Sequence, residues 1–341
     1  MAVVMVFALA ACGGGEEPAD DNGDNGNDVQ PPEDDKLVYM VTDMGGVDDE
    51  SFNQSAWEGL TRFKNEIDGW TADVIESHQE DDYTPNLRAA VSADAELVWA
   101  IGYMMAEQLD AVAADNPDGN FAIIDSASEE LLDNVAYVVF KEHEGSFLVG
   151  MIAGLMTESD TIGFIGGMEG DLIIKFESGF RAGVHAVNPD AEVLVQYADS
   201  WGDTARGNQI ATNMIGQGAD VIYHAAGGVG IGVAEACDDN EVWFIGVDMD
   251  QSHLTEYTLT SMIKRVDTAT YEISKQLAEG NFPGGTVRDL GLAEEGVGYV
   301  QSEHIPSEVI DQVEDLKQKI INGELEVPFT RDAVDEFKAN N

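Results

Sequence analysis

Carboxylates, amides and aromatic rings follow several short apolar runs of this sequence, at the points where the runs end. Asp43 and the pair Phe52-Asn53 come after the run 37–42, and Asp125 follows the run 121–124. Carboxylates accept hydrogen bonds from hydroxyl and ring N–H groups, and aromatic faces stack on flat rings or pack on sugars. For Phe52, helical spacing leaves a core position equally open.

A similar set follows in the second half of the chain. Trp201 lies in the polar segment 199–203, where an indole is hard to explain as a core residue, so stacking on a ligand is favoured. Gly227 opens a glycine run, Asp248 follows the run 243–247, and Lys264 is one of only 16 Lys and Arg residues. With so few positive groups, the two sets fit a neutral, hydroxyl-rich ligand with a planar part, and they do not fit an anion.

These residues need a scaffold, and the sequence predicts one of alternating strands and helices. Two series of such segments imply two similar α/β lobes, each a parallel sheet covered on both faces by helices. We expect lobe 1 at about 36–157 and lobe 2 at about 158–260, with later segments crossing between them. Ligands bind beyond the carboxyl ends of strands in such sheets, which is where the polar residues fall. The predicted strands are 37–42, 72–76, 97–101, 121–125, 135–140, 161–165, 192–197, 219–223 and 242–247, and the predicted helices are 51–66, 86–92, 104–114, 144–156, 172–187, 205–216, 230–237, 266–279 and 307–321.

Motifs for catalysis or for cofactor binding are missing from the sequence. The glycine run 227–232 fails the G-x-G-x-x-G pattern because Val233 stands at the third glycine position. There is no phosphate-binding G-x-x-x-x-G-K-[ST] loop, no G-x-S-x-G elbow, and no pair of histidines at metal-ligand spacing. Binding without a cofactor or metal is therefore the simpler interpretation. A cleft enzyme, such as a hydrolase or dehydrogenase, stays open as an alternative.

The N-terminus predicts export and lipid attachment. Residues 1–11 form an apolar run too short to span a bilayer, and Leu9-Ala10-Ala11-Cys12 looks like a lipoprotein processing site. We expect a signal peptide at 1–11, lipid on Cys12, a disordered acidic tether at 12–35 and a folded body at 36–341. No Lys or Arg precedes the apolar run, which leaves open a translation start upstream of Met1. An ordinary apolar N-terminus that meets a cysteine is the alternative.

The charge balance is extreme, with 66 Asp and Glu residues against 16 Lys and Arg, a net charge of −50. Such a surface repels phosphate backbones, which argues against nucleic-acid binding. In molar salt the Debye length falls to about 3 Å and the self-repulsion is screened. The sequence therefore predicts a salt-loving organism, with a generic acidic protein as the alternative. Cys237 is left without a partner and is interpreted as a small apolar residue on a helix.

Several long motifs, taken together, resemble the basic membrane protein family of ABC-transporter lipoproteins, which includes purine nucleoside receptors. The similarity runs from about residue 37 to 299. The motifs are Asp43-x-Gly45-Gly46-x-Asp48-Asp49-x-Ser51-Phe52-Asn53-Gln54-Ser55-Ala56-Trp57-Glu58-Gly59, Gly163-Phe164-Ile165-Gly166-Gly167-Met168, Phe176-Glu177-Ser178-Gly179-Phe180-x-Ala182-Gly183, Gln217-Gly218-Ala219-Asp220-Val221-Ile222, Ala226-Gly227-Gly228-x-Gly230-x-Gly232-Val233, Ile245-Gly246-Val247-Asp248-x-Asp250-Gln251 and Leu259-Thr260-Ser261-Met262-x-Lys264-Arg265-Val266-Asp267.

The resemblance implies a two-lobed periplasmic-binding-protein fold of type I with a hinge, a nucleoside ligand, and an ABC permease as partner. It further implies an extracytoplasmic monomer anchored to the membrane. A sugar or other metabolite as ligand, or a receptor that senses without transport, stays open. Carried over to this sequence, Phe52 and Trp201 would stack on the base, Asp43, Asn53 and Asp125 would meet the base or ribose, and Gly227, Asp248 and Lys264 would hold ribose hydroxyls.

Overall fold

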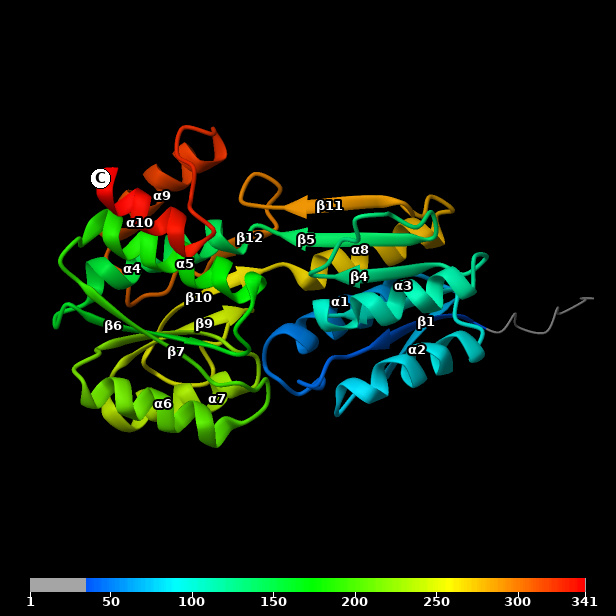
Figure 1. Ribbon diagram of the computed structural model, residues 1–341, viewed down its shortest axis with the longest axis horizontal. Coiled ribbons are helices and arrows are strands. Elements are labelled where there is room, and N and C mark those ends of the chain that lie inside the picture. The colour runs from blue at the N-terminus through cyan, green and yellow to red at the C-terminus, as the bar shows by residue number, and fades with distance from the viewer. Residues whose placement is uncertain (1–34, 341) are drawn as a thin grey trace, which may run out of the picture. The chain divides into compact units, whose positions relative to one another are not determined.

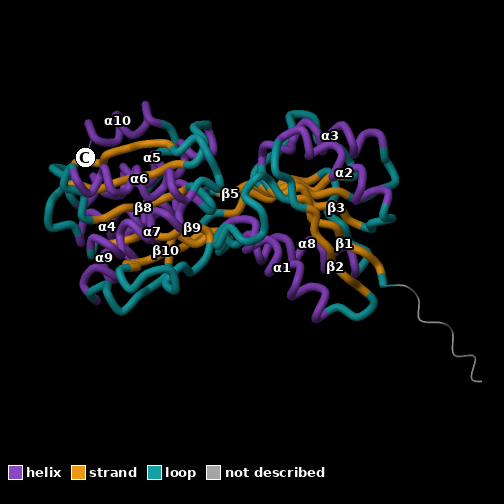
Figure 2. Tube along the Cα trace, turned by 90° about the horizontal axis from the view of Figure 1, so that it is seen from below, coloured by secondary structure: helices purple, strands orange, loops and turns teal. Residues whose placement is uncertain are grey.

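Two six-stranded sheets form the frame of the protein, as the computed structural model shows for residues 35–340 (Figure 1). The predicted signal peptide, Cys12 and nearly all of the predicted tether lie outside the described residues. Each sheet carries helices on both of its faces (Figure 2). The predicted fold class, two α/β lobes of the periplasmic-binding-protein type, is confirmed.

The first sheet has the strand order β2-β1-β3-β4-β5-β11, and all its neighbours pair in parallel. Helices α1 and α8 pack together on one face, and α2 and α3 pack on the other. The elements of this lobe are β1 (Lys36–Val41), α1 (Phe52–Glu66), β2 (Trp70–Ile75), the 3-10 turn η1 (Glu80–Asp82), α2 (Tyr83–Ser92), β3 (Leu97–Ile101), the 3-10 turn η2 (Tyr103–Met105), α3 (Ala106–Asp115), β4 (Phe121–Ile124), β5 (Val135–Phe140), α8 (Val266–Ala278) and β11 (Thr286–Leu290).

The second sheet repeats the order as β7-β6-β8-β9-β10-β12, with β12 antiparallel to β10. Helices α4 and α5 cover one face with α9 and α10 beside them, and α6 and α7 cover the other. The elements are α4 (Glu142–Met156), β6 (Thr161–Gly166), α5 (Asp171–Val187), β7 (Glu192–Tyr197), α6 (Thr204–Gly216), β8 (Val221–Ala225), α7 (Val229–Asn240), β9 (Trp243–Asp248), β10 (Thr258–Lys264), β12 (Val297–Tyr299), α9 (Ser307–Ile321) and α10 (Arg331–Asn340).

The chain crosses between the lobes at three places: after β5, after β10 and between β11 and β12. The first crossing is at Lys141, because α4 packs against α5, β10 and β12 of the second lobe. The sequence instead predicts this crossing near residue 157, after α4, because nothing in an apolar helix indicates which of two sheets it covers.

Three strands and one helix were absent from the sequence-based prediction. β10 contains Thr258, Thr260 and Ser261, which are buried hydroxyl residues that do not read as an apolar strand. Their hydroxyls find partners outside the strand: Thr260 Oγ1 donates to the carbonyl of Val300 at 2.6 Å, and Thr258 Oγ1 donates to the carbonyl of Thr255 at 2.8 Å. β11 is an exposed edge strand, β12 has three residues, and α10 buries Val334. Such elements are defined by tertiary contacts more than by their own pattern.

Glycines let α4 and α5 approach closely. A Cβ atom added to Gly179 would collide with the backbone of His143, and one added to Gly183 would collide with the carbonyl of Phe147. Cys237 is buried in α7 within the apolar core of the second lobe. Among residues 35–340, no helix is both long and apolar enough to cross a bilayer.

The contact between α4 and α5 gives a first prediction. Gly183→Ala is expected to lower the free energy of unfolding by about 1–3 kcal/mol, because its methyl group has no room without moving backbone. Gly216→Ala is the control, since no atom lies within 4 Å of a Cβ at that exposed end of α6. Chemical denaturation measures both; equal stability of the two variants would contradict this account of the α4–α5 contact.

Candidate functional site

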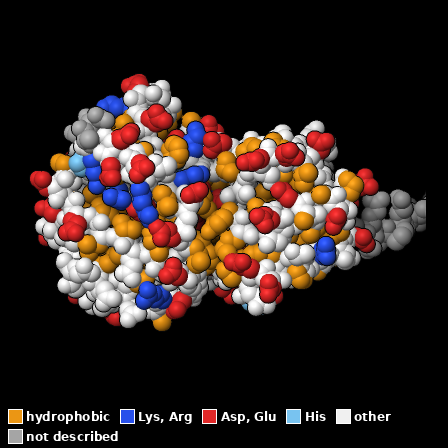
Figure 3. Space-filling view, in the orientation of Figure 1, with side chains coloured by type: hydrophobic (Ala, Val, Ile, Leu, Met, Phe, Trp, Pro, Cys, Tyr) orange, Lys and Arg blue, Asp and Glu red, His pale blue; other side chains and the backbone are white. Residues whose placement is uncertain are grey.

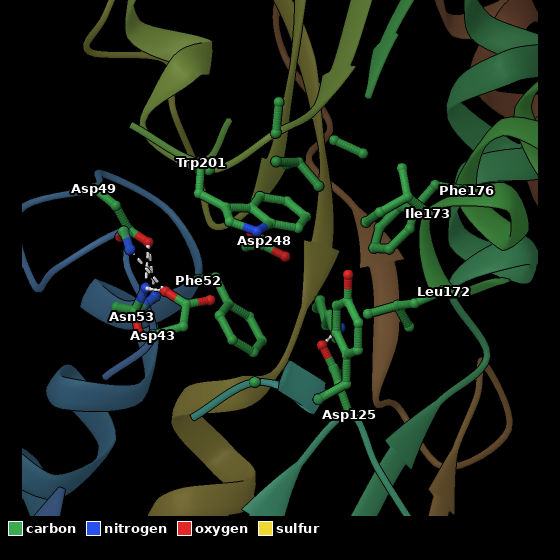
Figure 4. Close-up of a pocket in the computed structure, with 18 residues that line it drawn as sticks. Asp43, Asp49, Phe52, Asn53, Asp125, Leu172, Ile173, Phe176, Trp201 and Asp248 are labelled. Atoms are coloured by element: carbon green, nitrogen blue, oxygen red, sulfur yellow. Dashed lines mark hydrogen bonds and ion pairs between the residues drawn. The ribbon is translucent and has the colours of Figure 1, made fainter. Parts of the chain in front are cut away.

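A cavity of about 510 Å³ lies between the lobes, where the carboxyl ends of both sheets meet (Figure 4). This volume counts the space at the mouth of the cavity that is open to solvent. All eight residues predicted from the sequence line it, and their role as ligand contacts stays a prediction. The lining residues are Asp43, Gly45, Asp49, Phe52, Asn53, Gly102, Tyr103 and Asp125 from the first lobe, and Leu172, Ile173, Phe176, Trp201, Ala225, Ala226, Gly227, Val247, Asp248 and Lys264 from the second.

The loop between β1 and α1 supplies a hydrogen-bonded carboxylate–amide cluster. Asp49 caps α1 by accepting hydrogen bonds from the backbone N–H groups of Ser51, Asn53 and Gln54 at 2.9–3.0 Å. Asn53 Nδ2 donates to Asp49 Oδ2 at 3.0 Å and to Asp43 Oδ1 at 2.8 Å. Both amide donors of Asn53 are thereby used, and the side chain is fixed with its carbonyl oxygen unpaired. Burial raises the pKa of Asp43 to about 6.

Lys264 places a buried positive charge at the joint of the lobes. Its Nζ lies 2.6 Å from Asp125 Oδ2 of the first lobe and 3.1 Å from Glu142 Oε1 of the second. Burial alone would lower the pKa of Lys264, but the carboxylates of Asp125, Glu142 and Asp248 outweigh it and raise that pKa. Burial raises the pKa of Asp125 to about 6 although Lys264 opposes the shift. Nζ also lies 5.0–5.5 Å from the ring centroids of Phe52, Phe140 and Phe176.

Two of the cavity aspartates occupy equivalent positions in the two lobes. Asp125 follows β4 and Asp248 ends β9, which are the corresponding strands of the two sheets. Both have left-handed backbone, with φ of 68° and 67°. This conformation is uncommon outside glycine, although aspartate tolerates it better than most residues. Here it turns each carboxylate into the cavity at the strand end.

Asp248 also connects the lobes. Its Oδ2 accepts a hydrogen bond from Ser51 Oγ of the first lobe at 2.5 Å. Burial raises the pKa of Asp248 to about 7, with Lys264 and Ser51 opposing the shift.

Trp201 lies against glycines of its own lobe and is directed into the cavity (Figure 4). A Cβ atom on Gly167 would collide with the indole ring, so only glycine lets the ring lie there. Gly227 has a φ of +55°, and a Cβ on it would lie 3.2 Å from the carbonyl of Trp201. The buried indole Nε1 has no hydrogen-bond partner among the described residues. Phe52 faces the same cavity from the first turn of α1, in the other lobe.

Comparison with known proteins places the chain in a family. The family described as "Bmp: ABC transporter substrate-binding protein PnrA-like" matches residues 36–331. The chain belongs to the Bmp family. Its members are substrate-binding proteins of ABC transporters that work outside the cytoplasm. The resemblance noted in the sequence is confirmed.

Curated relatives in this family cover almost the whole chain. The "CD4+ T-cell-stimulating antigen" of Listeria innocua is 42% identical over 96% of this chain and 97% of its own length. The "ABC transporter nucleoside-binding protein BmpA" of Lactococcus lactis subsp. cremoris is 37% identical with the same coverage. A solved structure of an ABC transporter solute-binding protein from Aeropyrum pernix K1 aligns with a TM-score of 0.82 and 29% identity, over 90% of this chain and 98% of that one.

The glycine run 227–232 of this Bmp protein has a packing role beside the cavity. A Cβ on Gly230 would collide with the ring of His224, and one on Gly232 would collide with the carbonyl of Thr204 in α6. Of the glycines in this run, only Gly227 lines the cavity. The glycines therefore allow α7 to pack closely against its neighbours. This role agrees with the mismatch between the glycine run and the dinucleotide-binding pattern.

Sequence reasoning missed part of the cavity wall. Asp49 and Tyr103 line the cavity but were not among the predicted site residues. Leu172, Ile173 and Phe176 lie on the first two turns of α5 and form an apolar wall. Their spacing is that of any amphipathic helix, so no signal in the sequence separates a cavity wall from a core face here. Phe176 belongs to one of the family motifs, which was the one available hint.

The raised pKa of Asp248 leads to a second prediction. Between about pH 4 and pH 7 the folded protein keeps a proton that the unfolded chain has released, so this group's contribution to stability is lost as the pH rises through that window. In Asp248→Asn this contribution is absent, and the melting temperature is expected to fall less from about pH 4 to pH 8 than in the unmodified protein.

Asp250→Asn is the matched control, because Asp250 is an exposed aspartate two residues away. Differential scanning calorimetry of the ligand-free proteins at one salt concentration measures the effect. Parallel pH profiles for the unmodified protein and Asp248→Asn would refute a buried, protonating Asp248.

Proposed function

We propose that this protein is the substrate-binding component of an ABC importer and that it binds a nucleoside, with a purine as the base. The observation that carries the proposal is a pair of aromatic rings, Phe52 and Trp201, facing one interlobe cavity from opposite lobes. The name of the Lactococcus lactis relative as a nucleoside-binding protein supports it.

The polar wall of the cavity suits the rest of a nucleoside. Asn53 Oδ1, Asp125 Oδ1 and Trp201 Nε1 are buried atoms without partners among the described residues, so they are available to a ligand. In the proposal the base stacks between Phe52 and Trp201 while Asp43, Asn53 and Asp125 accept or position its donors and those of the ribose. Gly227, Asp248 and Lys264 hold ribose hydroxyls from the second lobe.

The charges of the cavity favour a nucleoside over a nucleotide. Four aspartates line the wall, and Lys264 is already paired with Asp125 and Glu142. A phosphate group would have to displace these carboxylates from the lysine. A neutral ligand with several hydroxyl donors has no such cost.

Binding in this cavity favours the closed arrangement of the lobes, because the ligand contacts both of them only when they are together. The closed form is what we propose docks on a membrane permease. The protein acts as a monomer that binds and releases its ligand unchanged, with no cofactor, metal or nucleic acid involved. We further propose that Cys12 carries the lipid anchor and that the acidic segment before residue 36 is the tether.

A nucleoside and a sugar can be separated by calorimetry. Inosine is expected to bind and ribose and glucose to bind much more weakly, because neither sugar fills the space between the two rings. Trp201→Ala should weaken inosine binding roughly 5- to 150-fold, the loss that corresponds to about 1–3 kcal/mol for one base–aromatic stack.

Trp57→Ala is the control for this variant, because Trp57 lies on α1 outside the cavity lining. Tighter binding of glucose than of inosine would replace the nucleoside by a sugar. Conversion of inosine to products during long incubation would point to an enzyme. Mass spectrometry of the small molecule that co-purifies with the protein tests the ligand class independently.

The surface charge supports a saline habitat as part of the proposal. Carboxylates are spread over the visible face of both lobes (Figure 3), in a chain of net charge −50. The melting temperature is expected to rise steeply as KCl is raised from about 0.1 M to about 2 M, because the Debye length shrinks from about 10 Å to below 3 Å. KCl is preferred to a sulfate, since sulfate stabilises most proteins by exclusion from their surface. A melting temperature that does not change with KCl concentration would contradict this explanation of the acidity.

A further inference from the structure

Beyond the cavity wall, two hydrogen bonds join the lobes at Glu50. The backbone carbonyl of Glu50, in the first lobe, accepts a hydrogen bond from Gln251 Nε2 of the second lobe at 2.7 Å. The Glu50 carboxylate lies 3.0 Å from His253 Nε2, also of the second lobe. None of these three residues lines the cavity. They lie beside the Ser51–Asp248 bond along the chain, so the arrangement belongs to closed lobes.

Hydrogen bonds within the second lobe hold Gln251 in place. Its side chain is buried, its Oε1 accepts from the backbone N–H of Val247 at 3.0 Å, and its backbone N–H donates to Ser261 Oγ at 3.1 Å. Its Oε1 also lies 2.9 Å from His224 Nε2. Because Oε1 is an acceptor, His224 must donate, which assigns its proton to Nε2.

His224 is suited to donate this hydrogen bond to Gln251 from a fixed position. Burial lowers the pKa of His224 to about 4, so the ring stays neutral at ordinary pH. The ring stacks on Phe244 with centroids 5.3 Å apart and has room only because residue 230 is glycine. The carbonyl end of the Gln251 amide is therefore fully occupied within the second lobe. Its N–H group is left aimed at Glu50.

The first lobe offers a matching acceptor. Glu50 has left-handed backbone with a φ of 53°, an uncommon conformation for a residue other than glycine. The Asp49 cap of α1 begins at the next residue, so the position of the Glu50 carbonyl is fixed by the same loop that carries Asp43 to the cavity. Donor and acceptor are both held in place before they meet, which keeps the entropic cost of the bond small.

We propose that Gln251 is a closure latch: a positioning residue that sets how long the lobes stay closed on the ligand without touching the ligand. The proposal rests on the proposed function in so far as closure retains a nucleoside. The Glu50–His253 pair contributes less, because the side chains of His253 and Glu50 are 51% and 35% exposed and exposed ion pairs are weak. Gln251 is 1% exposed.

The sharpest test is Gln251→Glu. A glutamate keeps an oxygen for the Val247 and His224 donors, and it replaces the amide N–H that reaches Glu50 by a second oxygen. We expect inosine to dissociate roughly 3- to 10-fold faster, from the range of single hydrogen bonds, with little change in the association rate. Stopped-flow fluorescence measures both rates. His253→Ala is the control and should change dissociation less than about 2-fold.

A ligand-independent measurement separates this proposal from the nucleoside assignment. Small-angle X-ray scattering of the ligand-free protein should show a larger radius of gyration for Gln251→Glu than for the unmodified protein and His253→Ala. If the radius of gyration increases in this way but inosine does not bind, the nucleoside assignment is wrong and the latch proposal stands. Should Gln251→Glu fail to fold, Gln251→Met supplies a neutral side chain of similar length for the same measurements. Dissociation rates and scattering equal to those of the unmodified protein would overturn the latch.

Discussion

The ion pairs of Lys264 are the interaction on which the rest of the site depends. A lysine that is 1% exposed is stable only with partners, and here Asp125 and Glu142 supply them from opposite lobes. Lys264 is the last residue of β10, and the chain leaves the second lobe for α8 directly after it. The charge that organises the cavity therefore sits at the end of a strand, next to a point where the chain crosses between the lobes. Any change of angle at that crossing moves the cation relative to Asp125 of the first lobe, which couples lobe closure to the electrostatics of the cavity.

The two sheets share one strand order, and the cavity is built from the same positions in both. Asp125 and Asp248 are one such pair, and Gly102 and Gly227, both with positive φ after β3 and β8, are another. The symmetry does not extend to the other side chains of the cavity. The first lobe brings Phe52 and the amide of Asn53, and the second brings Trp201 and the apolar start of α5. Two similar halves can thus hold an unsymmetrical ligand, polar on one part and flat on another.

A residue of the site could be predicted only where the sequence around it carries the signal. Asp125 and Asp248 could be found because strand ends are visible as breaks in an apolar run, and parallel sheets bring such ends together. Leu172 and Ile173 could not, because a helix face toward a cavity has the same periodicity as one toward a core. The strand β10 was hidden by its hydroxyl residues, whose hydrogen-bond partners lie outside the strand and come, for Thr260, from Val300. The role of Gln251 was beyond reach for the same reason: its partners His224 and Glu50 are 27 and 201 residues away.

Carboxylates at the surface and in the cavity respond differently to salt. Surface carboxylates interact through water, and molar salt screens them within about 3 Å. The cavity carboxylates are buried and directly hydrogen-bonded: Asp43 to Asn53 and Gly45, Asp125 to Lys264, and Asp248 to Ser51. Direct contacts of 2.5–2.8 Å leave no space for intervening ions, so salt that relieves the surface leaves these bonds in place. A chain of this fold can therefore become very acidic outside while the geometry of its buried cavity stays unchanged.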